Sequence, residues 1–364
     1  MKCGILTFHD ANNYGAVLQA YALQEVVKSL GYDVEIINYR QDYIIKNYKA
    51  IRINYNGVSE FIRSIASTII HYREFINREK VFNQFRRTFL NISNTIYTDY
   101  KEISGYDIYI SGSDQVWNFN VTNFDEAFFL KFNDKSGVKI SYAASIGSDQ
   151  IYVEEKEFIK HKIGNIDYIS VREKSAKEII QLLTDKHVEK VLDPTLLVDE
   201  TIWDKLLTSN TIKERYILVY SVGPVENIVE IAEIVRKQLG FRVYYLAGVK
   251  IKSKYEHINL KKVTPQEFIT LIKNADFIVT NSFHGTAFSL IFNKNFVTAP
   301  HKKSGVRMVE LLKSLNLLDR IISDKTDINK SFVVEINYES TNCILKNEKE
   351  KSKKFLEEAL KTKV

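Results

Sequence analysis

The feature that most constrains the fold is an alternation of short apolar runs with segments of helical spacing, which continues through most of the chain. Near the start, an apolar run at Ile5 to Phe8 precedes helical spacing from Gly15 to Leu30 and a second apolar run at Val34 to Asn38. Strand-length runs joined by helices are typical of parallel sheets with crossover helices. The sequence therefore predicts an α/β fold.

Asp193-Pro194 interrupts this alternation, because proline lacks an amide donor and restricts the residue before it. The 364 residues also exceed the usual size of one domain. We expect a Rossmann-like N-terminal domain at 1–198 with a basic helical insert at 40–100, a second Rossmann-like domain at 199–345, and a C-terminal helix at 346–364. The other expected strands are Ile108 to Ser111, Lys139 to Ala143, Tyr168 to Val171, Val188 to Leu192, Tyr216 to Val222, Arg242 to Leu246, Asp276 to Thr280 and Phe296 to Ala299. The other expected helices are Val58 to Ile70, Tyr72 to Leu90, Lys174 to Leu183, Val225 to Leu239, Pro265 to Asn274, Gly285 to Phe292 and Lys346 to Leu360.

Composition and motifs exclude several classes of protein. The two cysteines, Cys3 and Cys343, lie at opposite ends of the sequence, outside any zinc or disulfide spacing, which predicts a reduced, cytoplasmic protein. No window approaches the roughly 18 apolar residues of a membrane span. The sequence contains no GxxxxGK[ST], GxGxxG, HExxH or GxSxG pattern, so neither a nucleoside triphosphatase nor a zinc hydrolase is indicated, and we expect no metal site.

The formal charge of +6 arises within one segment. Between Arg40 and Leu90 there are ten lysines and arginines against four acidic residues, so the rest of the chain is neutral. A basic, aromatic-rich segment could contact a membrane surface or an anionic substrate, but a solvated face of an inserted helical hairpin is the more typical outcome. We expect no nucleic-acid partner, because the charge is confined to one insert without a recognition motif.

Polar clusters follow several predicted strands at the ends where parallel α/β sheets bind ligands. The segment from Asn281 to Thr286 joins the strand ending at Thr280 to a helix, so its amides could hold a phosphate or carboxylate. Gly285 would allow close approach, and His284 could carry a proton. A packed core histidine beside an ordinary helix cap explains the same residues equally well.

Three further charged positions fit an anion site. Arg172 ends a strand where a helix begins, although Glu173 could pair with it locally. Arg307 lies near the start of a predicted helix and could close over an anion or lie on the helix surface. Ser113-Asp114 could present a carboxylate to a sugar hydroxyl or form a simple turn.

Five strings occur in one order along the chain: HDANNYGAVLQAYAL, ISGSDQVWN, ISVREKSA, VLDPTLLV and TNSFHGTAFSLIFNK. Together they resemble the polysaccharide pyruvyl transferase family, from Gly4 to about Arg320. The resemblance implies a GT-B-like fold in which two Rossmann-like domains face a cleft and a C-terminal helix crosses back. It also implies transfer of pyruvate from phosphoenolpyruvate to paired sugar hydroxyls, with release of phosphate.

The resemblance assigns roles to the polar clusters. His284 is the expected general acid and Asp114 the expected base, with phosphoenolpyruvate as co-substrate and no other cofactor. Members of this family often carry Arg-Leu-His where this chain has Ser282-Phe283-His284, so Arg307 or Lys302 is the expected substitute for that arginine. The expected donor-binding residues are Arg172, Asn281, Ser282, Gly285, Thr286, Arg307 and Lys302. The expected acceptor-binding residues are Asp10, Asn13, Tyr14, Gly15, Gly112, Ser113 and Gln115.

The expected acceptor is a sugar or a lipid-linked oligosaccharide of cell-surface polysaccharide biosynthesis, such as exopolysaccharide or capsule. A lipid carrier would give residues 40–90 a peripheral membrane contact at the inner face. Two other functions stay open at this point. One is a GT-B glycosyltransferase that uses a nucleotide sugar, and the other is a binding module of the same fold that has lost its chemistry.

Overall fold

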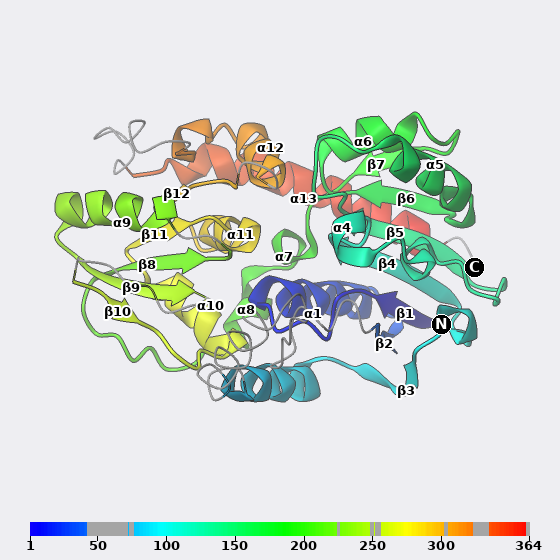
Figure 1. Cartoon of the computed structure of the whole chain (residues 1–364), viewed down its shortest axis with the longest axis horizontal. Helices are drawn as coiled ribbons and strands as arrows, with labels where there is room; N and C mark the ends of the chain where they lie inside the picture. The colour runs from blue at the N-terminus through cyan, green and yellow to red at the C-terminus, as the bar shows by residue number, and fades with distance from the viewer. Residues whose placement is uncertain are drawn as a thin grey trace, which may run out of the picture.

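The computed structural model describes residues 1–41, 72, 76–223, 226–247, 251, 256–301, 305–322 and 335–361. The chain forms two α/β halves, each built on one parallel sheet, and the halves lie side by side (Figure 1). The predicted fold class is confirmed. Lys302 and most of the predicted basic insert, including the helix expected at Val58 to Ile70, lie outside the described residues.

The N-terminal half contains a seven-stranded sheet in the order β3-β2-β1-β4-β5-β6-β7. Its centre is apolar on both faces, as expected for a parallel sheet covered by helices, and Ile5 in β1 aligns with Ile36 in β2 and Ile110 in β4. The strands are β1 (Lys2–Leu6), β2 (Asp33–Tyr39), β3 (Ile92–Tyr97), β4 (Ile108–Asp114), β5 (Val138–Ala144), β6 (Tyr168–Val171) and β7 (Val188–Lys190). The labelled helices are α1 (Tyr14–Ser29), η1 (Tyr100–Glu102), α4 (Phe119–Thr122), η2 (Glu126–Phe129), α5 (Val153–Lys162), η3 (Ile163–Asn165) and α6 (Lys174–Gln181).

The C-terminal half contains a five-stranded sheet in the order β10-β9-β8-β11-β12. Two short helices, α7 (Pro194–Leu197) and α8 (Glu200–Asp204), lie between the two sheets in the sequence. The strands are β8 (Tyr216–Ser221), β9 (Arg242–Ala247), β10 (Ile258–Asn259), β11 (Phe277–Thr280) and β12 (Phe296–Thr298). The helices are α9 (Glu226–Leu239), α10 (Pro265–Asn274), α11 (Phe283–Ile291), α12 (Val306–Ser314), η4 (Leu318–Arg320) and α13 (Tyr338–Lys361). The domain limits expected at residues 198 and 345 stay a prediction.

Two expected elements differ from the structure. The segment 40–100, expected to be a helical insert, contains strand β3, which pairs with β2 and extends the sheet at its edge. Three of its six side chains are polar, and Ile96 is exposed, so this edge strand lacks the apolar run that marks a buried strand. The C-terminal helix, expected from Lys346, already begins at Tyr338.

One hydrophobic core extends through both halves and holds them together. The Tyr14 ring of α1 stacks on Phe268 of α10 with 4.6 Å between ring centroids, and its hydroxyl donates to the Val263 carbonyl at 2.8 Å. Trp203 of α8 is fully buried, and its ring lies 4.9 Å from that of Phe288 in α11. Apolar burial of this kind is the main stabilising term in folding, so the halves form one packed unit.

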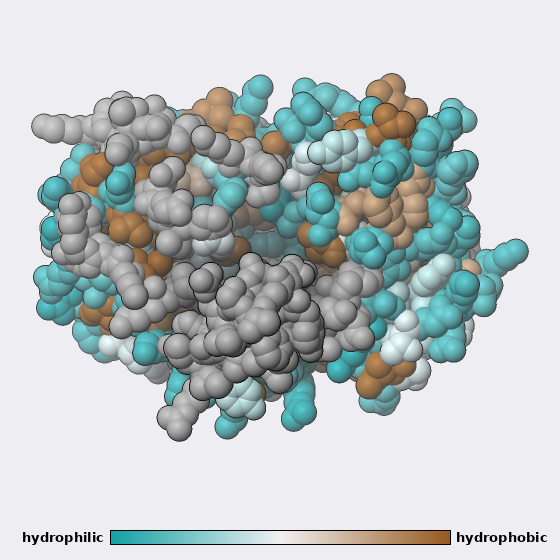
Figure 2. Space-filling view, viewed as in Figure 1, coloured by the Kyte–Doolittle hydropathy of each residue, from teal (hydrophilic) through white to brown (hydrophobic). Residues whose placement is uncertain are grey.

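The face shown in Figure 2 recedes between the two halves, and its described residues mix hydrophilic and hydrophobic character. Among the helices that the structure describes, none has the length and apolar character needed to span a membrane.

Helix α13 connects the two halves along their back (Figure 1). At its start the Tyr338 hydroxyl donates to the Lys294 carbonyl in the C-terminal half. Further along, the Ser352 hydroxyl accepts a hydrogen bond from the Leu192 amide at 2.9 Å, and Leu356 is fully buried against the N-terminal half. The helix is therefore an integral part of the core rather than a tail.

We predict that Leu356→Ala lowers the free energy of unfolding by about 2–5 kcal/mol, because it leaves a cavity where α13 packs on the first sheet. Urea denaturation followed by circular dichroism measures this change. Lys354→Ala is the matched control on the exposed face of the same helix, and it removes only an exposed i,i+4 pair with Glu358. Equal stability of the two variants would contradict the packing role of α13.

Candidate active site

Charged side chains from both halves meet at one place between the two sheets. Asp114 ends β4, Arg172 directly follows β6, and Asp193 lies between β7 and α7. From the other half come His284, in the first turn of α11, and Arg307 in α12. Because ligands bind beyond the carboxyl ends of parallel strands, this is the expected position of a site, and both halves contribute to it.

Asp193 is the centre of the cluster. Its Oδ2 accepts hydrogen bonds from Arg172 Nη1 at 2.7 Å and Ser113 Oγ at 3.1 Å, while its Oδ1 accepts from the amide and hydroxyl of Thr195. Burial works to raise the pKa of this carboxyl, but His284, when protonated, and Arg172 outweigh it, so the pKa lies below its usual value. Asp193 is therefore a buried carboxylate with its oxygens fully used.

Arg172 is held on three sides. Its Nε donates to Glu173 Oε1 at 3.1 Å, its Nη2 lies 3.9 Å from Asp114 Oδ1, and its guanidinium lies 4.4 Å from the centre of the Phe283 ring. Burial works to lower its pKa, but Glu173 and Asp193 outweigh that effect, so the pKa is raised and the charge is permanent. Within the described chain, the buried Nη2 makes no hydrogen bond and stays able to bind a ligand oxygen.

His284 is enclosed at the junction of the halves. Its ring packs against Gly15, where a Cβ atom would lie only 2.0 Å from Nδ1, so a larger residue at position 15 would displace the imidazole. The Nε2 atom lies 3.9 Å from Asp193 Oδ2 and has no hydrogen bond to any described residue. Burial lowers the pKa of His284 and Asp193 only partly offsets this, so the ring is neutral at pH 7.

Arg307 is a second, partly buried cation. Its guanidinium lies 5.9 Å from the centre of the Phe283 ring, the same ring that Arg172 contacts. Burial, together with repulsion from Arg172, lowers the pKa of Arg307 to about 10. Its buried Nε has no hydrogen-bond partner among the residues described. Two guanidinium groups held near one aromatic ring with unused N–H groups favour binding of an anion.

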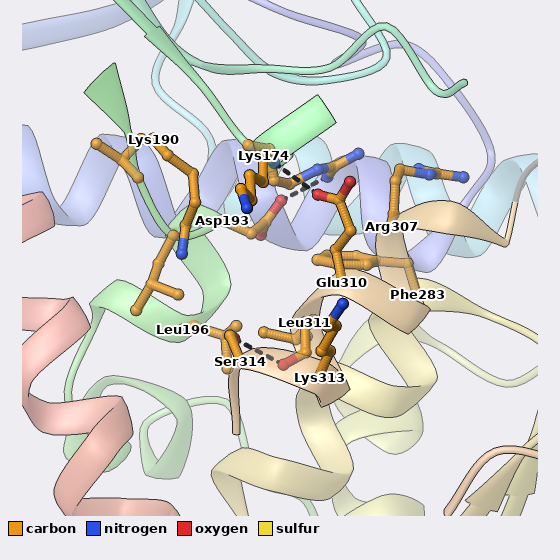
Figure 3. A pocket seen from close by; sticks show the side chains of 13 residues that line it. Lys174, Lys190, Asp193, Leu196, Phe283, Arg307, Glu310, Leu311, Lys313 and Ser314 are labelled. Atoms are coloured by element: carbon orange, nitrogen blue, oxygen red, sulfur yellow. Dashed lines mark hydrogen bonds and ion pairs between the residues drawn. The ribbon is translucent and has the colours of Figure 1, made fainter. Parts of the chain in front are cut away.

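A cavity of about 290 Å³ opens beside this cluster (Figure 3). Its walls come from the start of α6, from the segment between β7 and α7, and from α12. The wall is part apolar and carries five basic side chains against two acidic ones, and this excess of positive charge suits a small anionic ligand. The lining residues are Arg172, Lys174, Lys190, Val191, Leu192, Asp193, Leu196, Phe283, Arg307, Glu310, Leu311, Lys313 and Ser314.

The other described donor-binding candidates, around His284, make local contacts. Ser282 caps α11 by accepting from the Gly285 amide, and the Thr286 amide donates to the Ser282 carbonyl. Asn281 accepts from the Val222 amide and so ties the end of β11 to that of β8. The amides of Gly285 and Thr286 are thus already used inside the helix, and the anion would be bound by side chains instead.

The acceptor-loop candidates lie at the start of α1. Asn13 is the helix cap, with its side chain accepting from the Ala16 amide at 3.3 Å. Asp10 lies 3.7 Å from Arg86 of the insert helix that covers residues 76–89. Tyr14 is buried by its contacts with the other half, so a contact with a sugar would require those contacts to break.

Two insert arginines fix this loop from the outside. Arg78 donates twice to the Asn12 carbonyl, and Arg86, 5% exposed, donates to the Ala11 carbonyl and the Asn12 side chain. The sequence favours a solvated helix face for the basic insert. Arg78 and Arg86 differ from that expectation, because they bind the loop instead of facing solvent. Their charge is used within the molecule to hold the loop that leads into α1.

The second acceptor segment lies at the end of β4. Ser113 is fully buried, and its hydroxyl is bound to Asp193. Gln115 accepts from the Asn118 side chain, while Gly112 runs against the Tyr142 carbonyl, where a Cβ atom would lie 2.2 Å away. Asp114, half-buried beside Arg172, is the member of this segment whose carboxylate faces the cluster.

Asp193, Phe283 and Glu310 were not expected among the site residues. The sequence pattern at Asp193-Pro194 indicates a domain boundary, although a carboxylate directly after a strand is also the signal for a site residue. Phe283 carries no charge, so its contact with two arginines could not be inferred from its position in the sequence.

Comparison with known structures shows the fold. The chain is similar to the UDP-GlcNAc 2-epimerase from Neisseria meningitidis bound to UDP-GlcNAc, with a TM-score of 0.50 and 12% identity over 99% of each chain. It is also similar to the putative UDP-N-acetylglucosamine 2-epimerase from Listeria monocytogenes, with a TM-score of 0.50 and 10% identity, over 98% of this chain and 90% of that chain. These similarities support a GT-B-like architecture and nothing more specific.

Comparison of the sequence with curated proteins and with family models gives more specific information than the comparison of structures. A search of curated proteins found no match. A family model described as polysaccharide pyruvyl transferase matches residues 13–302, which include Asp114, Arg172, Asp193 and His284. This match extends over most of the chain, and the protein belongs to the polysaccharide pyruvyl transferase family.

Proposed function

We propose that the protein transfers the pyruvyl group of phosphoenolpyruvate to two hydroxyls of a sugar, forming a cyclic ketal during polysaccharide biosynthesis. One observation carries the proposal: Arg172 Nη2, Arg307 Nε and His284 Nε2 are buried in the same cluster without hydrogen-bond partners in the described structure. Phosphoenolpyruvate carries a carboxylate and a phosphate within a few ångströms. Two guanidinium groups suit such a ligand, because they bind planar oxyanions through paired N–H groups.

The proposed reaction balances with the residues present. A proton is added to the methylene carbon of the donor, one sugar hydroxyl attacks the adjacent carbon, the bond to phosphate breaks, and the second hydroxyl closes the ketal. One of the two hydroxyl protons replaces the proton that was added to carbon, and the other protonates the released phosphate. His284, which lies near Asp193, is the proposed acid, and Asp114, which lies near Arg172, is the proposed base.

His284 is neutral before the donor binds, because burial lowers its pKa. An anion placed beside its Nε2 would raise that pKa, so donor binding itself would supply the proton that the reaction needs. Asp193, 3.9 Å away, would stabilise the resulting imidazolium. Arg307 is the proposed substitute for the cation absent at Ser282, which here serves as a helix cap.

The proposed acceptor is a sugar or a lipid-linked oligosaccharide. It would approach the cluster from the loop at residues 10–15. Peripheral contact with the inner membrane surface would fall on residues 40–90, most of which lie outside the described structure.

We predict that phosphoenolpyruvate releases phosphate in the presence of galactose- or mannose-containing acceptors, and that His284→Gln slows this reaction about 10²–10⁴-fold, as for loss of a general acid. A coupled phosphate assay measures the rate, and mass spectrometry of the acceptor identifies the ketal. His301→Gln, an exposed histidine of the same half, is the matched control. Full activity of His284→Gln would remove the proposed acid, and donor binding without turnover on any acceptor would favour a binding module.

We predict that Arg307→Gln weakens phosphoenolpyruvate binding about 10- to 100-fold, since one charge-assisted contact contributes about 1.5–3 kcal/mol. Isothermal titration calorimetry measures the affinity without an acceptor. Arg215→Gln is the control, because Arg215 is an exposed arginine that pairs with Asp276 before β11. An unchanged affinity in Arg307→Gln would show that another group supplies the cation.

We predict that donor binding takes up a proton at His284. Its pKa lies below 6.5 in the free protein and rises on binding, so the affinity falls as pH increases between the two pKa values. Calorimetry in buffers of different ionisation enthalpy measures the proton uptake. His284→Gln should leave only the contribution of the donor phosphate, and an identical pH dependence in both proteins would contradict this role.

A further inference from the structure

The carboxylate of Glu310 links the two halves at the edge of the cavity. It extends from α12 toward the start of α6 (Figure 3). Its two oxygens accept from two successive backbone amides, that of Lys174 at 2.5 Å and that of Ser175 at 3.1 Å. A carboxylate of the chain itself therefore occupies the N-terminal amides of α6, the position that an anionic ligand would occupy.

The helix does not cap itself there. The residue in the cap position is Glu173, whose side chain makes no capping hydrogen bond and instead binds Arg172 Nε. The first amides of α6 therefore depend on a group from outside the helix. In this structure Glu310 provides that group from the other half of the molecule.

A second observation points to a ligand at the same place. Arg172, 7% exposed, lines this cavity, and its buried Nη2 lacks a hydrogen-bond partner within the described residues. Arg172 lies two residues before Lys174 in the sequence. On the other wall, Arg307 lies three residues before Glu310 in α12, so the two side chains are neighbours, with Cβ atoms about 5–6 Å apart.

We propose that the α6 amides of Lys174 and Ser175 form an oxyanion site for the phosphate of the donor, and that Glu310 occupies this site as an internal competitor until the donor binds. This inference rests on the proposed function. In this proposal the guanidinium groups of Arg172 and Arg307 bind the carboxylate of the donor, and the amides of Lys174 and Ser175 bind its phosphate. When Glu310 is displaced, α12 loses its hydrogen bonds to α6, so donor binding also releases a contact between the two halves.

Removal of the internal carboxylate should strengthen anion binding. We expect Glu310→Ala to bind inorganic phosphate and phosphoenolpyruvate about tenfold more tightly than the unmodified chain, and Glu310→Gln to show a smaller gain because it loses only the charge. Titration calorimetry with each probe measures this, and thermal unfolding verifies that each variant is folded. Unchanged or weaker binding in both variants would overturn the proposal and leave Glu310 as a structural contact.

The amide itself can be tested by a matched pair in the Glu310→Ala background. Lys174→Pro deletes the N–H group at the first position of α6, where proline is compatible with a helix and with the extended conformation of Glu173. Lys174→Ala removes the same side chain and keeps the amide. The proline variant should lose the tenfold gain while the alanine variant retains most of it, and equal affinities would overturn the amide site.

These tests separate the two proposals. If Glu310→Ala binds phosphate more tightly but the protein never releases phosphate from phosphoenolpyruvate with an acceptor, the oxyanion site stands and the proposed reaction does not. If acceptor-dependent turnover occurs but Glu310→Ala gains no affinity for either probe, the reaction stands and the oxyanion site does not.

Discussion

The buried carboxylate of Asp193 is the interaction on which the site depends. A charge removed from water is costly unless it is paired and hydrogen-bonded, and here Arg172, Ser113 and Thr195 use both oxygens. Ser113 lies in β4, Arg172 directly follows β6 and Thr195 lies in α7, so this carboxylate, which itself follows β7, ties the ends of β4 and β6 to the start of α7. His284, from the other half, lies 3.9 Å from the same carboxylate.

The second constraint is the close contact between the halves. Gly15 allows the His284 ring to approach the backbone of α1, and Tyr14 beside it stacks on Phe268. The imidazole is therefore positioned by the N-terminal half although it belongs to the C-terminal half. Burial produced by this contact lowers the pKa of His284, so the same packing that positions the ring also sets its protonation state.

The distribution of positive charge follows from these contacts. Arg78 and Arg86 of the insert helix bind the carbonyl groups of the loop before α1, which fixes the loop that the proposed acceptor would approach. Arg172 and Arg307 face Phe283 instead and keep unused N–H groups. Arg78 and Arg86 thus stabilise the fold, whereas Arg172, although paired with Asp193 and Glu173, and Arg307 each keep an N–H group available to an anion.

The sequence alone determined the architecture, because apolar runs and helical spacing are local patterns. They can be recognised without knowing which elements pack against each other. Strand β6 (Tyr168–Val171) and helix α10 (Pro265–Asn274) were predicted with the bounds observed. The edge strand β3 was missed because it lacks a buried face. Strand ends likewise identified Arg172, Asp114 and His284 as candidates. Only the tertiary structure decided that Asp193 joins them, that Tyr14 and the amides of Gly285 and Thr286 are used internally, and that Glu310 reaches α6. Those contacts join residues that are far apart in the sequence and become neighbours only when the two halves pack. A local sequence pattern contains no information about such contacts.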